Sequence, residues 1–110
     1  MTAPSGTSLR MLRCLPQPAD DRRTSLVGHT DIGSLTILFN ITGGLQLLVP
    51  DSTDVKDEKS WRYVQPVPGC AIINLGDAMV EWTAGILRSN MHRITYSPGE
   101  QGEVPRYSLA

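Results

Sequence analysis

The sequence predicts a single all-β domain of the barrel or jelly-roll type. Three observations predict it. Apolar runs are short, turn residues interrupt them at close intervals, and no long stripe with helical period appears. With 110 residues the chain has room for one domain of ordinary size. About eight short strands separated by turns are typical of barrels and jelly rolls.

The first half of the chain carries three or four of these strands. Residues 9–15 form an apolar run that ends at Pro16, because proline cannot donate a hydrogen bond to a sheet. Residues 25–39 contain one or two strands, with a break expected at Gly33 and Ser34. Residues 45–49 follow the Gly43-Gly44 turn as a further short strand.

The second half begins after a charged loop at residues 50–60, which we expect to be solvated. Residues 61–64 predict a strand that ends before Pro66, and residues 70–75 a nearly continuous apolar strand. The next run, at 78–83, fits a strand or one helical turn. Strands are expected at 91–96 and, as the opening of a last one, at 106–110.

Charge and composition exclude several classes of function. The formal net charge is −1, and the ten Lys and Arg residues are scattered among acidic ones, so nucleic acid is not expected as a partner. The chain begins without a charged and apolar leader and has no apolar run of about 20 residues, so we expect no membrane span and a cytoplasmic location. Cys14 and Cys70 are far apart and form no CxxC motif; we expect free thiols.

The first candidate site combines His29, Asp31 and His92. Residues i and i+2 of a strand share a face, so His29 and Asp31 are expected to project together. Two histidines and one carboxylate on one face of a metal leave positions open, which suits non-haem Fe(II) oxygen chemistry. Taken alone, the pattern is equally compatible with a surface histidine at 92 and a turn with an Asx cap at 29–31.

Arg106 and Ser108 form a second candidate group on the last expected strand. They share a face by the same spacing, and an arginine fork beside a hydroxyl suits a carboxylate. A dicarboxylate such as 2-oxoglutarate needs such an anchor at one end while its 2-oxo acid end binds iron. The two groups therefore favour an oxygenase that uses both.

The motifs occur in the order and spacing of a known family. The chain resembles the 2-oxoglutarate/Fe(II)-dependent dioxygenases, and within them the isopenicillin-N-synthase-like branch with plant and fungal metabolite oxidases. The resemblance rests on Gly28-His29-Thr30-Asp31-Ile32-Gly33, Gly43-Gly44-Leu45, Pro68-Gly69-Cys70, Asn74-Leu75-Gly76-Asp77, Asn90-Met91-His92-Arg93 and Arg106-Tyr107-Ser108.

The resemblance implies a fold and a reaction. The fold is a double-stranded β-helix with iron in one mouth, and residues 1–110 correspond to its catalytic core, apparently truncated at both ends. His29, Asp31 and His92 become the ligands of Fe(II), Arg106 and Ser108 hold the far carboxylate of 2-oxoglutarate, and Asn74 and Asp77 are structural. The implied reaction is hydroxylation, desaturation or ring closure of a small metabolite by molecular oxygen, coupled to decarboxylation of 2-oxoglutarate to succinate.

The chain departs from the family's pattern in two ways, and the second, the expected lack of the N-terminal region and of the rest of the last strand, favours another hypothesis. Cys14 stands where many members have a tyrosine that contacts the co-substrate, and a thiol is a weak donor. The expected last strand is short, which predicts a fraying end at Arg106 and exposed barrel edges that invite self-association. The alternative is therefore a truncated or vestigial metal-binding β-barrel with little independent activity.

Overall fold

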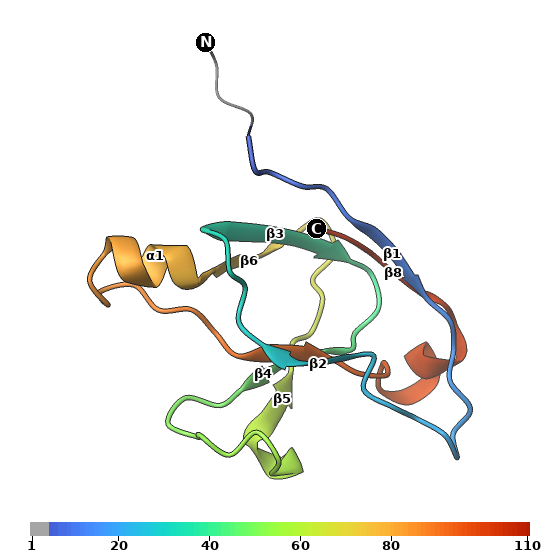
Figure 1. Ribbon diagram of the computed structural model, residues 1–110. Coiled ribbons are helices and arrows are strands. Elements are labelled where there is room, and N and C mark those ends of the chain that lie inside the picture. Colours follow the sequence, from blue (N-terminus) through green and yellow to red (C-terminus); the bar gives the residue numbers. More distant parts are fainter. Residues whose placement is uncertain (1–4) are drawn as a thin grey trace.

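The chain folds into two antiparallel sheets of four strands each. In the computed structural model, which describes residues 5–110, one sheet has the order β1 (Met11–Cys14), β8 (Arg106–Leu109), β3 (Leu35–Asn40) and β6 (Ile72–Leu75). The other has the order β2 (Leu26–His29), β7 (His92–Ile94), β4 (Leu45–Leu48) and β5 (Trp61–Tyr63). Figure 1 shows the two sheets as facing layers. The predicted all-β jelly-roll class is confirmed.

Short helices occupy some of the connections. The run at 78–83, for which strand and helical turn were both open, is helical: α1 spans Asp77–Trp82 and lies at one end of the two layers (Figure 1). Two 3₁₀ helices, at Glu58–Ser60 and Gly99–Glu103, lie in loops. Within residues 5–110, no helix combines the length and the apolar character that crossing a bilayer requires.

The last strand is held on both sides, so the expectation that Arg106 sits on a fraying end is wrong. Cys14 of β1 is the Cα partner of Arg106, and Asn40 of β3 is the partner of Ser108. Backbone pairing with β1 at Arg106 and with β3 from Ser108 onward ties this strand into the sheet. Arg106 is accordingly only 5% exposed.

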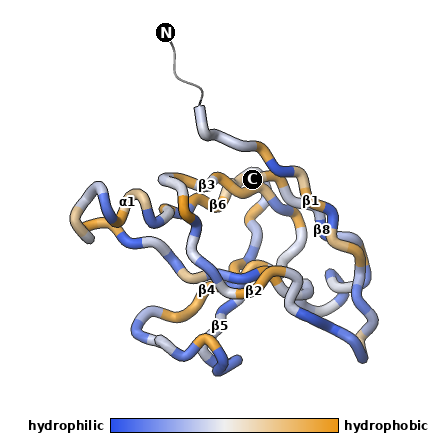
Figure 2. Tube along the Cα trace, in the orientation of Figure 1, coloured by the Kyte–Doolittle hydropathy of each residue, from blue (hydrophilic) through white to orange (hydrophobic). Residues whose placement is uncertain are grey.

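Several apolar residues of the first sheet lie on its outer face, and polar residues share its inner face with apolar ones such as Leu38. Along β3, Ile37 and Phe39 are 44% and 50% exposed, whereas Thr36 between the apolar positions is half-buried. Ile37 faces Ile73 of β6 across the pair, and both strands carry hydrophobic colour in Figure 2. Fully packed apolar side chains are correspondingly few: within residues 5–110, Leu45 and Trp61 are the buried hydrophobic residues.

The outer side of the second sheet is closed by a cluster around Arg93. The Arg93 guanidinium lies 4.3 Å from the Trp61 ring centroid, donates to Gln46 Oε1 at 2.7 Å and pairs with Glu58. The indole also packs on Gly28, where a Cβ would lie 3.0 Å from a ring carbon. Both strands that carry the histidines are therefore braced from behind by one indole ring.

Candidate metal centre

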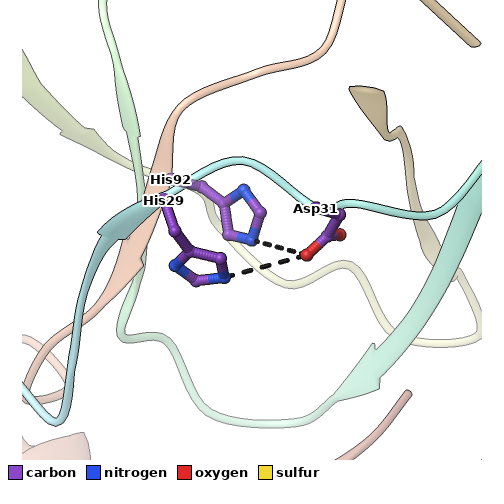
Figure 3. Close-up of side chains that lie close together, drawn as sticks. All are labelled: His29, Asp31 and His92. Carbon is purple, nitrogen blue, oxygen red and sulfur yellow. Dashed lines mark ion pairs between the residues drawn. The ribbon is translucent and has the colours of Figure 1, made fainter. Parts of the chain in front are cut away.

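The structure brings His29, Asp31 and His92 together. His29 is the last residue of β2, His92 is the first of β7, and the two are Cα partners. Each imidazole Nε2 lies 3.7 Å from Asp31 Oδ1, and all three candidate donor atoms lie within 4.8 Å of one another. Figure 3 shows the two rings and the carboxylate pointing at a common centre. Imidazole and carboxylate bind divalent transition metals such as zinc at about 2.0–2.2 Å, so small side-chain shifts would let one ion reach all three.

Backbone carbonyls orient both histidines for metal binding. His29 Nδ1 lies 2.8 Å from the carbonyl oxygen of Val27, and His92 Nδ1 lies 3.0 Å from that of Asn90. A carbonyl only accepts, so each Nδ1 carries the proton and donates it. The lone pair is then on each Nε2, the atom that faces Asp31. A ligating histidine is commonly oriented in this way.

Asp31 is oriented by two donors on the first sheet. Its Oδ2 accepts from Thr36 Oγ1 at 2.6 Å and from Asn74 Nδ2 at 2.7 Å, which leaves Oδ1 directed at the histidines. Burial raises the pKa of Asp31, but the hydrogen bonds from Asn74 and Thr36 and the two nearby histidines outweigh it, so the pKa lies below its ordinary value of 3.8. The carboxylate is therefore ionised at neutral pH and available to a cation.

Thr36 was not among the predicted site residues, and Asn74 was expected to be structural. They are Cα partners across β3 and β6, each a polar residue inside an apolar strand. A lone polar residue in such a strand needs a buried partner. That pattern was visible in the sequence, but only the register between the two strands shows that both donors converge on one carboxylate.

The strand argument for Asp31 was correct in outcome and wrong in detail. β2 ends at His29, and Asp31 lies in the irregular segment that follows, outside the β2–β7 ladder. Its main chain is held instead by Asp77, whose backbone N–H donates to the Asp31 carbonyl at 2.7 Å. The convergence of the three side chains thus depends on tertiary contacts and not on strand alternation.

Arg106 and Ser108 share the inner face of β8, as their spacing predicts. The Arg106 guanidinium donates from Nε to the Gly43 carbonyl at 2.9 Å and from Nη1 to Ser108 Oγ at 3.2 Å. Its Nη2 is buried without a hydrogen-bond partner among the described residues. Burial lowers the pKa of Arg106, although contact with Cys14 raises it in part. An arginine nevertheless stays cationic near neutrality, so Nη2 of Arg106 remains a charged, buried donor that lacks an acceptor.

Cys14 lies beside this guanidinium. Cys14 is half-buried and is the Cα partner of Arg106. Both residues line a small surface hollow, together with Thr95 and residues of the neighbouring loops. Both cysteines of the chain, Cys14 and Cys70, are free thiols.

Comparison with known proteins identifies one family. The family model of the 2OG-Fe(II) oxygenase superfamily matches residues 6–110. A 2-oxoglutarate-dependent dioxygenase, iboH of Amanita muscaria, is 44% identical over 108 residues, which is 97% of this chain and 50% of that protein. A 2-oxoglutarate-dependent dioxygenase of Aspergillus fumigatus is 42% identical over 122 residues, 96% of this chain and 31% of its own length.

Solved structures give the same result. Full-length Neurospora crassa T7H in complex with alpha-KG and 5-formyluracil superposes with a TM-score of 0.78 at 27% identity, covering 92% of this chain and 32% of that one. The chain therefore spans between about a third and a half of the length of these relatives.

Proposed function

Because the chain belongs to the 2OG-Fe(II) oxygenase superfamily, whose cofactors are Fe(II) and 2-oxoglutarate, we propose that it oxidises a small metabolite with molecular oxygen. His29, Asp31 and His92 hold the iron, and Arg106 with Ser108 anchors the far carboxylate of 2-oxoglutarate. When bound, iron and 2-oxoglutarate supply oxidation of a C–H bond coupled to formation of succinate and carbon dioxide. Hydroxylation, desaturation and ring closure all fit this chemistry.

The observation that carries the proposal is the convergence of three donors from two segments of the chain, residues 29–31 and residue 92. Two Nε2 lone pairs and one ionised carboxylate oxygen meet at a centre that is partly open: the side chains of His29, Asp31 and His92 are 33%, 23% and 12% exposed. Three ligands on one side of an ion leave positions for a chelating 2-oxo acid and for oxygen. The donor set therefore fits Fe(II).

Arg106 supports the co-substrate assignment independently of the metal. A buried guanidinium nitrogen without an acceptor is costly unless a ligand supplies one. A carboxylate is the natural partner, because it accepts charge-assisted hydrogen bonds from the guanidinium and, beside it, from the Ser108 hydroxyl. In this arrangement β8 binds and orients the dicarboxylate, while β2, β7 and the segment after β2 that carries Asp31 hold the metal.

The decisive experiment measures succinate formed from 2-oxoglutarate by the 110-residue chain with Fe(II), beside Asp31→Ala and the control Asp54→Ala. Asp54 is an exposed loop carboxylate that caps the backbone N–H of Lys56 at 2.9 Å. We expect succinate from the wild type and from Asp54→Ala and none above background from Asp31→Ala. Equal succinate from the wild type and both variants would contradict the proposal.

A second candidate, a metal-binding β-barrel module without independent turnover, is favoured by the openness of the site. His29 is one-third exposed, and bulk water at the metal promotes side reactions. The same samples distinguish the two functions. Stoichiometric metal binding by the wild type, without succinate formed from 2-oxoglutarate in the presence of any candidate substrate, would select the module.

Self-association is also proposed, and the outer face of the first sheet suits it better than the strand edges. Ile37, Phe39 and Ile73 lie there, between 44% and 61% exposed. A continuous apolar face of this kind commonly marks a contact surface.

A reducing compartment such as the cytoplasm suits the two free thiols, Cys14 and Cys70.

A further inference from the structure

Asp77 connects the two segments that carry the candidate metal ligands. Its Oδ2 accepts a hydrogen bond from Thr30 Oγ1 at 2.8 Å, and its Oδ1 accepts one from Ser89 Oγ at 2.5 Å. Thr30 lies between His29 and Asp31, and Ser89 lies three residues before His92. Both carboxylate oxygens of Asp77 are thus occupied by hydroxyl donors from the two ligand segments.

The hydrogen bonds of the Asp77 carboxylate to Thr30 and Ser89 lie just beyond the end of the β2–β7 ladder. β2 ends at His29 and β7 begins at His92, so the pair His29↔His92 is at the end of the ladder. Beyond it the chain runs forward to Thr30 and Asp31 on one side and backward to Ser89 on the other. Strand pairing therefore positions the two imidazoles relative to each other but does not position Asp31 relative to them.

The turn that carries Asp77 is packed tightly against the Asp31 segment. Gly76 N–H donates to the Ser34 carbonyl at 3.0 Å, and Asp77 N–H donates to the Asp31 carbonyl at 2.7 Å. A Cβ at Gly76 would lie 2.0 Å from the Gly33 carbonyl oxygen, which is far inside any contact distance. Only glycine permits this approach, and the Asp77 carboxylate is consequently held on a rigid support.

We propose that Asp77 is a positioning residue that sets the place of the Asp31 carboxylate relative to the His92 imidazole. It acts through Thr30 and Ser89 and through its own backbone N–H, and it does not touch the metal. The inference rests on the proposed function, because it concerns the geometry of the same site. Groups that hydrogen-bond directly to a metal ligand typically change metal affinity about 10- to 100-fold when removed, and the Asp77 carboxylate acts one residue further away, so we expect the lower end of that range.

The test uses Co(II) as the probe and the full 110-residue chain. Thr30→Val and Ser89→Ala each remove one hydroxyl and leave the three ligands and the Gly76 turn unchanged. We expect each to weaken Co(II) about tenfold or more, measured by calorimetry, and to shift the visible ligand-field bands of the bound ion. Thr30→Ser, which keeps the hydroxyl, should restore both. The control Ser52→Ala removes a hydroxyl that donates to Ser60 Oγ at 2.9 Å, outside this network, and should change neither.

A double-mutant cycle separates positioning from general destabilisation. If both hydroxyls act through one carboxylate, Thr30→Val should have no further effect on Co(II) affinity in the Asp77→Ala background, whereas unrelated destabilising changes add. An undiminished effect of Thr30→Val in that background would overturn the inference. So would affinities of Thr30→Val and Ser89→Ala within twofold of the wild type, and these two variants alone decide the question if Asp77→Ala does not fold. A wild-type chain that binds no Co(II) would instead contradict the proposed function.

Discussion

Replacing Arg106 with methionine should remove the anchor for the far carboxylate of 2-oxoglutarate. The guanidinium is 5% exposed, its Nη2 has no acceptor among the described residues, and it adjoins the Ser108 hydroxyl. A hydrogen bond to a charged group contributes about 1.5–3 kcal/mol, so the Kd for 2-oxoglutarate should rise about 10- to 150-fold. Arg106→Lys keeps the charge but loses the planar fork, so its Kd for 2-oxoglutarate should lie between those of the wild type and Arg106→Met.

The measurement compares two ligands on the Co(II)-loaded chain by calorimetry. 2-Oxopentanoate has the 2-oxo acid end and the same carbon chain as 2-oxoglutarate but lacks the far carboxylate. The wild type should prefer 2-oxoglutarate, and Arg106→Met should bind both compounds alike. An unchanged preference in Arg106→Met would refute the role of Arg106 as anchor.

Ser97 provides the matched control, because Arg106 also has a structural bond. Arg106 Nε and Ser97 Oγ both donate to the Gly43 carbonyl, at 2.9 and 3.0 Å. Losing either weakens the support of that buried carbonyl, with a cost of up to about 1–3 kcal/mol of folding free energy. Ser97→Ala should therefore lower the melting temperature and leave the ligand preference intact. Equal losses of preference in Ser97→Ala and Arg106→Met would show that the effect is only structural.

Three further predictions follow from the site. His92→Ala should weaken Co(II) binding by more than about 100-fold in a calorimetric titration, since it removes a ligand and not an outer-shell partner; unchanged affinity would exclude His92 as a ligand. The pKa of Asp31 in the folded, metal-free chain lies below 3.8, so ionisation of this carboxyl stabilises the fold above that pH. The contribution is lost as the pH falls through the lower folded pKa. Asn74→Leu removes one of the hydrogen bonds that lower this pKa and should reduce the acid-dependent loss of stability in unfolding curves between pH 2 and 7. Bound 2-oxoglutarate should slow maleimide labelling of Cys14, which lies beside Arg106, and leave exposed Cys70 unaffected, as mass spectrometry of the labelled peptides would show; equal protection of both thiols would contradict the placement of the anchor.

Much of the fold was predictable because its signals are local. Proline and glycine end strands through their own backbone properties, so the strands were predicted close to their observed places, although residues 25–39 were left as one or two strands and form two. The spacing of Arg106 and Ser108 determines that they share a face of any strand. Residues 78–83 remained ambiguous, since a short apolar run fits both periods. In the structure the start of α1 is held by backbone hydrogen bonds from Asp77 and Ala78 to the carbonyls of residues 31–33, which no local pattern indicates.

The residues that could hold a metal and a dicarboxylate can be read from the sequence, because imidazole, carboxylate and guanidinium groups have this chemistry in any fold. How these groups are held depends on contacts between distant segments. Asp31 lies beyond the end of β2, so its direction depends on Thr36, Asn74 and Asp77, which no local rule connects to it. Arg106 is held in place because β8 lies between β1 and β3. The β1 and β8 segments pair although they are about 95 residues apart in the sequence. The physical reason is that strand order and register depend on long-range pairing, whereas residue chemistry and turn preference belong to the residues themselves.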